Sequence, residues 1–400
     1  MLHGTRSFLV SAPHVKLHHL RRLDDRIAAH LDGLAVAGEY GWTVVEAALA
    51  TPGPGEVFTA VVRAIEDRNA AGLDKLLALA EAVPGSQAGL ISAFGWVSAE
   101  SLRGITKALL NSSSAFHRQV ALASCAMHRV DPASALDAAI LDADAGLRGR
   151  ALRVAGDVGR LDLLPTCLKA LADEDDHCRF QAARSALLLG NRDASVAALQ
   201  SVALMPGPHR SPALGLLLKV VAPPQAHAVL KSLAQDASSV RTLMQGAGIA
   251  GVPHYVPWLI KQMDDLKLTR LAGESFSFIT GLDLAYLDLE RKPPEGVELG
   301  PTDNPEDEDV AMDEDDSLPW PDPAKIEAWW SANSQRSLPG VRYFMGEPPT
   351  YPHCLDVLKN GYQRQRIAAA LCVSLLQIGT PLFPTSAPAW RQQRSLAKMG

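Results

Sequence analysis

Cysteines, aromatic residues and long apolar runs are scarce in this 400-residue chain. Its five cysteines form no C-x-x-C pair, so the sequence predicts reduced, buried thiols rather than a disulfide framework or a zinc knuckle. Aromatic residues make up only 6%, a low share for β-sandwiches. No apolar run approaches the roughly 20 residues that cross a bilayer, and Lys16 and Arg21 interrupt the N-terminal apolar stretch. We therefore expect an all-α, cytoplasmic protein.

Motifs for catalysis and cofactor binding are also missing. The twelve histidines are scattered, and no His-Glu dipeptide, GxSxG, P-loop or HExxH motif occurs. The run Gly246–Gly251 lacks the preceding strand of a dinucleotide-binding loop, and we interpret it as a helix end. Basic residues are dispersed rather than gathered in a stripe, which disfavours nucleic acid as a partner. We expect no catalytic residues, no cofactor and no metal site.

What the chain has instead is an arginine that recurs with a small or apolar residue three positions later. Successive arginines lie 30, 31, 31, 31 and 29 residues apart: Arg118, Arg148, Arg179, Arg210, Arg241 and Arg270. Each period predicts two helices, and a pair of this size buries its apolar faces only by stacking on its neighbours. The predicted pairs are 131–142 with 145–158, 162–172 with 175–189, 193–203 with 208–220, 223–234 with 237–249 and 253–264 with 267–280.

Three aspartates precede repeat arginines by six residues each: Asp142, Asp173 and Asp264. This spacing allows Asp–Arg pairing along the turns between neighbouring repeats. An arginine that returns once per repeat is typical of a scaffold, so we interpret these residues as a structural ladder rather than as ligand sites. The predicted fold is an α-solenoid of stacked antiparallel helix pairs.

The period and the R-x-x-A pattern resemble HEAT repeats of the short bacterial type over residues 87–280 and 355–378. Three further stretches are similar to proteobacterial HEAT-repeat proteins commonly encoded among type VI secretion genes. They are residues 25–34 (DRIAAHLDGL), 340–348 (GVRYFMGEP) and the tail 381–392, which contains PLF and APAWRQ. The resemblance implies a cytoplasmic accessory protein of a contractile injection system and supplies no catalytic residues.

Departures from the repeat divide the chain into four expected segments. These are an N-terminal helical cap with degenerate repeats over 1–86, the HEAT-like solenoid over 87–292, an acidic insert over 293–323, and an aromatic and basic segment over 324–400 that contains a final helix pair. In the cap, the charges Asp24, Asp25 and Arg26 lie beside a leucine stripe, and we interpret them as a solvated face.

Acidic residues are concentrated in the insert. Residues 293–324 contain twelve Asp or Glu and no Lys or Arg, leaving 32 acidic against 38 basic residues elsewhere. Because this composition buries too little apolar surface to offset chain entropy, we expect a disordered or mobile loop with solvated charges. An alternative stays open, in which the insert folds back over the basic body and competes with an acidic partner.

Large aromatic residues gather after the insert. Such residues often dominate binding interfaces, but the same clustering fits a packed lid, and both interpretations stay open. The candidate partner-binding residues are Trp329, Trp330, Arg336, Arg342, Tyr343, Phe344, Arg364 and Arg366.

Two function classes are compatible with these observations. The first is a non-catalytic protein-binding scaffold, an adaptor or chaperone-like accessory protein of a type VI secretion system that holds a secreted effector or a spike component on its concave surface. An immunity protein that neutralises a secreted toxin is the alternative within this class. The second class, a HEAT-type enzyme or nucleic-acid-binding module, is disfavoured by the missing motifs.

Overall fold

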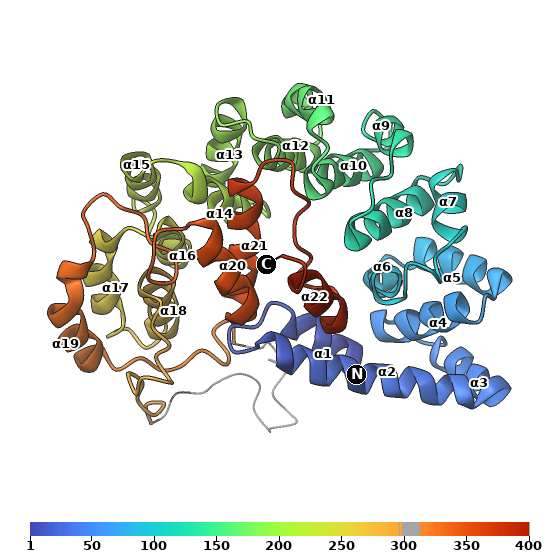
Figure 1. Ribbon diagram of the computed structural model, residues 1–400, viewed down its shortest axis with the longest axis horizontal. Helices are drawn as coiled ribbons and strands as arrows, with labels where there is room; N and C mark the ends of the chain where they lie inside the picture. Colours follow the sequence, from blue (N-terminus) through green and yellow to red (C-terminus); the bar gives the residue numbers. More distant parts are fainter. Residues whose placement is uncertain (296, 298–312, 400) are drawn as a thin grey trace. The chain divides into compact units, whose positions relative to one another are not determined.

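The computed structural model describes residues 1–295, 297 and 313–399. All regular secondary structure in these residues is helical, which confirms the all-α prediction (Figure 1). The five predicted helix pairs are present, with boundaries that differ from the expected ones by a few residues. Among the described residues no single helix is long and apolar enough to cross a membrane, although the bent pair Ala70–Ala82 and Pro84–Trp96 passes that test by length and composition together.

Contacts divide the chain into two compact units. Unit 1 consists of Met1–Ala198 and Leu358–Gly400, and unit 2 consists of Leu199–Val357. The C-terminal residues therefore pack with the N-terminal helices, a pairing that the repeat pattern does not indicate. Two helices, α13 (Ala194–Leu204) and α20 (Tyr351–Asn360), run across the boundaries between the units.

Unit 1 is built from helix pairs in succession. Its helices are α1 (Leu2–Leu9), α2 (Leu17–Val36), α3 (Gly38–Ala48), α4 (Pro54–Glu66), α5 (Ala70–Ala82), α6 (Gln87–Trp96), α7 (Ile105–Leu110), α8 (Ala115–His128), α9 (Ser134–Ala139), α10 (Ala145–Val158), α11 (Leu164–Lys169), α12 (Asp176–Leu188), α21 (Gln363–Leu376) and α22 (Ala389–Leu396). Helix α4 contacts α6, α6 contacts α8, α8 contacts α10 and α10 contacts α12, while α5, α7, α9 and α11 each pack against the helix that follows.

Unit 2 repeats this contact pattern. Its helices are α14 (Arg210–Val220), α15 (Pro223–Leu233), α16 (Val240–Ala250), α17 (Val256–Gln262), α18 (Thr269–Thr280) and α19 (Pro323–Asn333). Helix α16 contacts both α14 and α18, and α17 packs against α18 and α19. A core cluster that includes Met244, Leu259 and Phe276 joins α16, α17 and α18.

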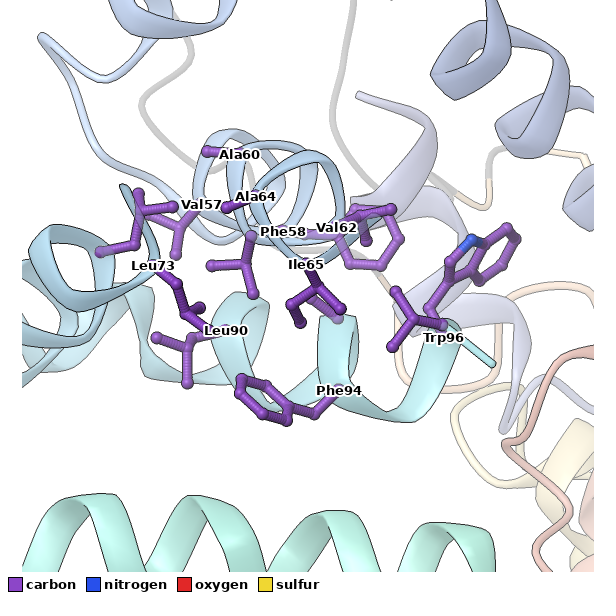
Figure 2. Close-up of a cluster of buried hydrophobic side chains, with 14 of the residues drawn as sticks. Val57, Phe58, Ala60, Val62, Ala64, Ile65, Leu73, Leu90, Phe94 and Trp96 are labelled. Atoms are coloured by element: carbon purple, nitrogen blue, oxygen red, sulfur yellow. The ribbon is translucent and has the colours of Figure 1, made fainter. Parts of the chain in front are cut away.

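The small residue three positions after each arginine explains the close packing of successive helices. Ala121, Ala151, Ala182 and Ala213 are fully buried. Upstream of this register the same role passes to larger apolar side chains, and those of α4, such as Ile65, lie between α4 and α6 (Figure 2). Removing such side chains from water supplies the main favourable free energy of the stack.

Helices α10 and α12 approach each other closely. The Ser185 hydroxyl donates a 2.6 Å hydrogen bond to the Leu152 carbonyl. Gly156 faces the same serine, and a Cβ added there would lie 2.5 Å from Ser185 Oγ and 2.8 Å from its Cα. Only a residue without a side chain fits this contact.

We expect Gly156→Ala to lower the free energy of unfolding by about 1–3 kcal/mol, because the added methyl group would push α10 from α12. The matched control is Gly33→Ala in α2, where an added Cβ has no atom within 4 Å. Alanine there should stabilise by about 0.5–1 kcal/mol through helix propensity. Urea titrations of both variants measure the difference, and equal effects would contradict the close packing.

Candidate functional site

The repeat arginines of unit 1 form a ladder of ion pairs between successive helices. Arg118 donates to Asp142 at 2.8 Å, and Arg148 donates through Nε and Nη2 to both carboxylate oxygens of Asp173, at 2.6 and 2.9 Å. The side chains of Arg148 and Asp173 are 19% and 10% exposed. A bidentate pair of this kind fixes the geometry of two neighbouring repeats as well as their charge.

The aspartate six residues before an arginine contributes its backbone rather than its carboxylate to that arginine. Arg148 Nη1 donates to the carbonyl oxygen of Asp142 at 2.8 Å, and Arg179 Nη1 donates to that of Asp173 at 2.6 Å. The carboxylate points to the arginine of the preceding repeat instead. Each aspartate therefore joins two repeats, one through its main chain and one through its side chain.

The ladder shifts the pKa of its carboxylates. The hydrogen bond from Arg148 is the largest cause that lowers the pKa of Asp173 below its usual value. For Asp142 the main cause is the backbone N–H of Asp144, and Arg118 adds to it. Both aspartates stay ionised through the neutral and mildly acidic range.

The remaining predicted ladder residues have other partners. Arg179 pairs with Asp176 on its own helix. Arg210 makes no ion pair with any described residue, and Asp264 is exposed with no ion pair in the same part of the chain. The ladder in its shared form covers the repeats from Arg118 to Arg179.

Arg241 and Arg270 bind an acidic clamp, which we define as Asp313, Glu314 and Asp315. Arg241 contacts Asp315 at 2.6 Å and Glu314 at 3.0 Å. Arg270 pairs with Asp313, donates to the carbonyl oxygen of Asp315 at 3.0 Å, and lies over the Trp320 ring at 4.9 Å.

The clamp corrects the expectation that the whole stretch 293–323 is disordered and solvated. Residues 313–323 are structured, and Asp315 is only 4% exposed. The physical reason is that Arg270, which is itself buried, requires counter-charges that its own repeat does not supply. The N–H of Arg291 donates to the Trp320 carbonyl and that of Asp322 to the Leu289 carbonyl, so the insert leaves and returns side by side. Residues 296 and 298–312 lie outside the described residues.

Most of the eight candidate partner-binding residues are occupied within the fold. Trp329, Trp330 and Tyr343 pack against the core of unit 2, and Phe344 is buried. Arg336 is the exposed member of the set.

The basic members beyond Arg336 are also engaged. Arg342 donates to the carbonyl oxygens of Lys219, Val221 and Ala250. Arg364 donates to the Ser11 carbonyl at 3.2 Å, and Arg366 is fully buried. Arg364 and Arg366 belong to unit 1 and the other six residues to unit 2.

A buried polar junction connects both ends of unit 1. Asp24, which has no exposed surface, accepts from Arg6 Nε and from the backbone N–H of Ala389, both at 2.6 Å. This corrects the interpretation of Asp24 as part of a solvated face. Asp24 directly precedes residues 25–34 of α2, and its partner Ala389 lies in the tail 381–392, so the contact lies at two of the stretches that carry the resemblance.

A second part of the junction surrounds Arg366. Its guanidinium donates to the Leu358 carbonyl at 2.8 Å, to Gln392 Oε1 at 2.6 Å and to Gln363. Burial lowers the pKa of Arg366 to about 10, so the side chain stays charged at neutral pH. The buried guanidinium of Arg366 is thus bound by uncharged oxygen atoms and has no access to water. We interpret its role as structural rather than as recognition of a partner.

Two extended segments cover the C-terminal ends of the stacked helices. In unit 1, Leu382 N–H donates to the Asp157 carbonyl, and Arg391 donates to the carbonyls of Gly95 and Val97, each at 2.8 Å. We call residues 377–391 the unit 1 strap; they link the end of α21 to the first turn of α22, which contains Arg391. Helix ends leave carbonyl groups without partners, and the strap supplies donors for them.

The corresponding unit 2 strap is residues 342–346. The N–H of Tyr343 donates to the Gly251 carbonyl and that of Met345 to the Phe278 carbonyl, both at 2.7 Å. Gly251 has a φ of +67°, and a Cβ there would lie 1.9 Å from the Tyr343 carbonyl oxygen. The straps therefore depend on glycine at a helix end for their close approach.

Reactive groups are held in unreactive settings. All five cysteines are free and buried, and burial raises the pKa of Cys125 to about 11 and of Cys167 to about 12. No group of three or more His, Cys, Asp or Glu among the described residues is placed to hold a metal ion. His128 beside a cavity of about 460 Å³ is hydrogen-bonded through Nε2 to the Phe94 carbonyl, and burial lowers its pKa.

Comparison with protein-family models, curated proteins and solved structures gave no match. The likeness to HEAT-repeat and type VI secretion proteins rests on the residues quoted above.

Sequence reasoning missed the polar junction and both straps. One signal for the junction was present, because Asp24 lies four residues after Leu20 and three before Ile27 and so falls on the apolar face of its helix. No comparable signal marks the straps, since their hydrogen bonds use backbone groups common to every residue.

We expect Asp173→Asn to lower the free energy of unfolding at pH 7 by about 1–3 kcal/mol, because it breaks the bidentate pair with Arg148. The folded-state pKa of Asp173 is lowered, so its contribution is complete above the unfolded value of about 3.9 and is lost as pH falls through the folded value. The difference in the free energy of unfolding between Asp173→Asn and wild type should therefore decrease as the pH falls below about 4.

Asp264→Asn is the control, since Asp264 is exposed and has no ion pair among the described residues. Its effect should stay within about 0.5 kcal/mol at every pH. Urea titrations from pH 7 to pH 3 provide the measurement, and a pH-independent loss in Asp173→Asn would show that the pair contributes no charge-dependent stability.

Proposed function

We propose that this chain is a non-catalytic protein-binding scaffold with an α-solenoid fold of HEAT type. Three features support the solenoid. Helices α4, α6, α8, α10 and α12 contact one another in order, the small residue of each R-x-x-A pattern is buried between them, and each ladder aspartate joins two repeats. A repeat array of this kind gains stability from every interface between neighbours and offers a long surface to a partner.

The observation that carries the binding role is the uncovered apolar surface on the first helices. Val36 and Tyr40 are 89% and 73% exposed, whereas the outer face of a terminal repeat normally has to be polar for solubility. Many of the buried polar side chains are engaged in the ladder, the clamp and the junction, where they hold the fold. A protein partner explains this distribution best.

The resemblance of residues 25–34, 340–348 and 381–392 narrows the proposal. It suggests a cytoplasmic accessory protein of a type VI secretion system, an adaptor that holds a secreted effector or a spike component. An immunity protein bound to a secreted toxin is the second candidate. The three stretches do not distinguish an adaptor from an immunity protein, and neither role requires a catalytic residue.

Affinity purification of the tagged chain from the cells that produce it tests the scaffold role. We expect one stoichiometric protein, identified by mass spectrometry, that stays bound in about 0.5 M salt because apolar contacts resist screening. Recovery of nucleic acid that is lost steeply with salt, without a stoichiometric protein, would contradict the proposal. Deleting the gene separates the two roles: loss of cargo delivery indicates an adaptor, and death only beside armed sister cells indicates immunity.

A further inference from the structure

An apolar stripe lies uncovered at the N-terminal edge of unit 1. Tyr40 and Val44, one turn apart on α3 and so on one face, are 73% and 44% exposed. Val36, the last residue of α2, precedes Tyr40 by four residues across the turn at Gly38 and is 89% exposed. We call these three residues the edge stripe.

A cavity continues the edge stripe into the fold. It has a volume of about 360 Å³ and is lined by residues that include Val44 and Ala48 from α3, Leu31 and Leu34 from α2, and Phe58 from α4. Val44 belongs to both the stripe and the cavity wall. An apolar side chain of a partner could fill this cavity and lose its contact with water, while adjacent partner residues cover the stripe. High-affinity interfaces commonly have such a buried anchor surrounded by contacts that exclude water.

Acidic side chains predominate around the edge stripe, although the cavity wall also includes the N-terminal residue Met1 and His30. Residues 27–62 contain four acids, Asp32, Glu39, Glu46 and Glu56, and no Lys or Arg. None of these acids forms an ion pair with a described residue, whereas Asp67 nearby pairs with Arg63. The stripe therefore has a rim of free carboxylates.

This combination selects one kind of occupant. A helix with apolar residues on one face and Lys or Arg beside them would cover the stripe and neutralise its rim. An anionic lipid surface carries the same charge as the rim and is repelled. A second copy of the chain docked through the same face would bring the two acidic rims together.

We propose that the edge formed by α2 and α3 binds an amphipathic helix with basic flanks that belongs to a partner protein. The inference rests on the proposed scaffold function and assigns the surface and the chemistry of its partner. The bound helix adds one more layer to the succession that starts at α3 and α4, with the cavity beside Val44 receiving one of its apolar side chains.

A direct test uses a designed Leu/Lys amphipathic peptide of about 18 residues, ~27 Å long when helical, labelled for fluorescence anisotropy. We expect binding to the full chain, and a loss of about tenfold or more in affinity for the double variant Tyr40→Ser and Val44→Ser. Leu141→Ser, at another exposed apolar position of unit 1, is the control and should bind as wild type. Circular dichroism verifies that all variants are folded.

The charge of the rim has a test of its own. Glu39→Gln with Glu46→Gln should weaken binding and flatten its salt dependence, because the attraction between the rim and the peptide lysines is screened by salt. A peptide with Glu in place of every Lys should fail to bind. Equal binding of the two peptides, or binding that the double serine variant leaves unchanged, would overturn the proposal.

Two further outcomes would assign the edge to another occupant. Sedimentation with anionic phosphatidylserine vesicles that is lost in the double serine variant would identify a membrane surface. Self-association in analytical ultracentrifugation that is lost in the same variant would identify a second copy of this chain. Either result overturns the basic-helix assignment.

The natural partner separates this inference from the scaffold proposal. If the stoichiometric protein recovered by affinity purification still binds the double serine variant, the scaffold function stands and the assignment of the edge is wrong. If wild type recovers no protein, the scaffold proposal is wrong whatever the peptide shows. Loss of that protein in the double serine variant, together with retention in Leu141→Ser, supports both.

Discussion

A guanidinium that leaves water must find oxygen acceptors in fixed directions, and this requirement organises much of the molecule. In unit 1 the ladder meets it with a carboxylate from the next repeat and a carbonyl from the preceding turn. In unit 2 Arg270 meets it with the acidic clamp, 43 residues further along the chain. Arg366 meets it with a carbonyl and two glutamine side chains. The common solution is that acceptors come from a neighbouring element, so that each buried arginine ties two parts of the chain together.

Most polar and aromatic groups at the candidate surfaces are used in contacts within the fold, and one surface differs from them. The straps occupy the C-terminal ends of helices in both units. The aromatic residues after the insert are also largely taken up by packing. The edge of α2 and α3 differs, because its apolar side chains and its carboxylates are both without partners among the described residues. Recognition is therefore best sought at the start of the helical succession rather than along the helix ends.

The sequence predicted the helix pairs well because their information is local. An arginine every 30 or 31 residues with a small residue one turn later reports the register of a buried helix face, and the structure places Ala121, Ala151 and Ala182 there. It did not predict which carboxylate meets which arginine. Asp142 lies close in sequence to Arg148 but gives its carboxylate to Arg118, and Asp24 meets a backbone N–H 365 residues away. Such pairings depend on how the chain returns upon itself, which spacing alone does not encode.

The unit 1 strap has a consequence for how the protein is made. The bond between Arg391 and the Val97 carbonyl joins residues 294 positions apart. At typical rates of about 5–20 residues per second, the ribosome delivers the strap roughly 15–60 s after the helix end that it covers. During that interval the nascent helices present carbonyl groups that have no partner until the strap has been synthesised. Unit 1 is thus complete only after the strap has been made, so a product that stops before Arg391 would have its helices formed and these carbonyl groups uncovered.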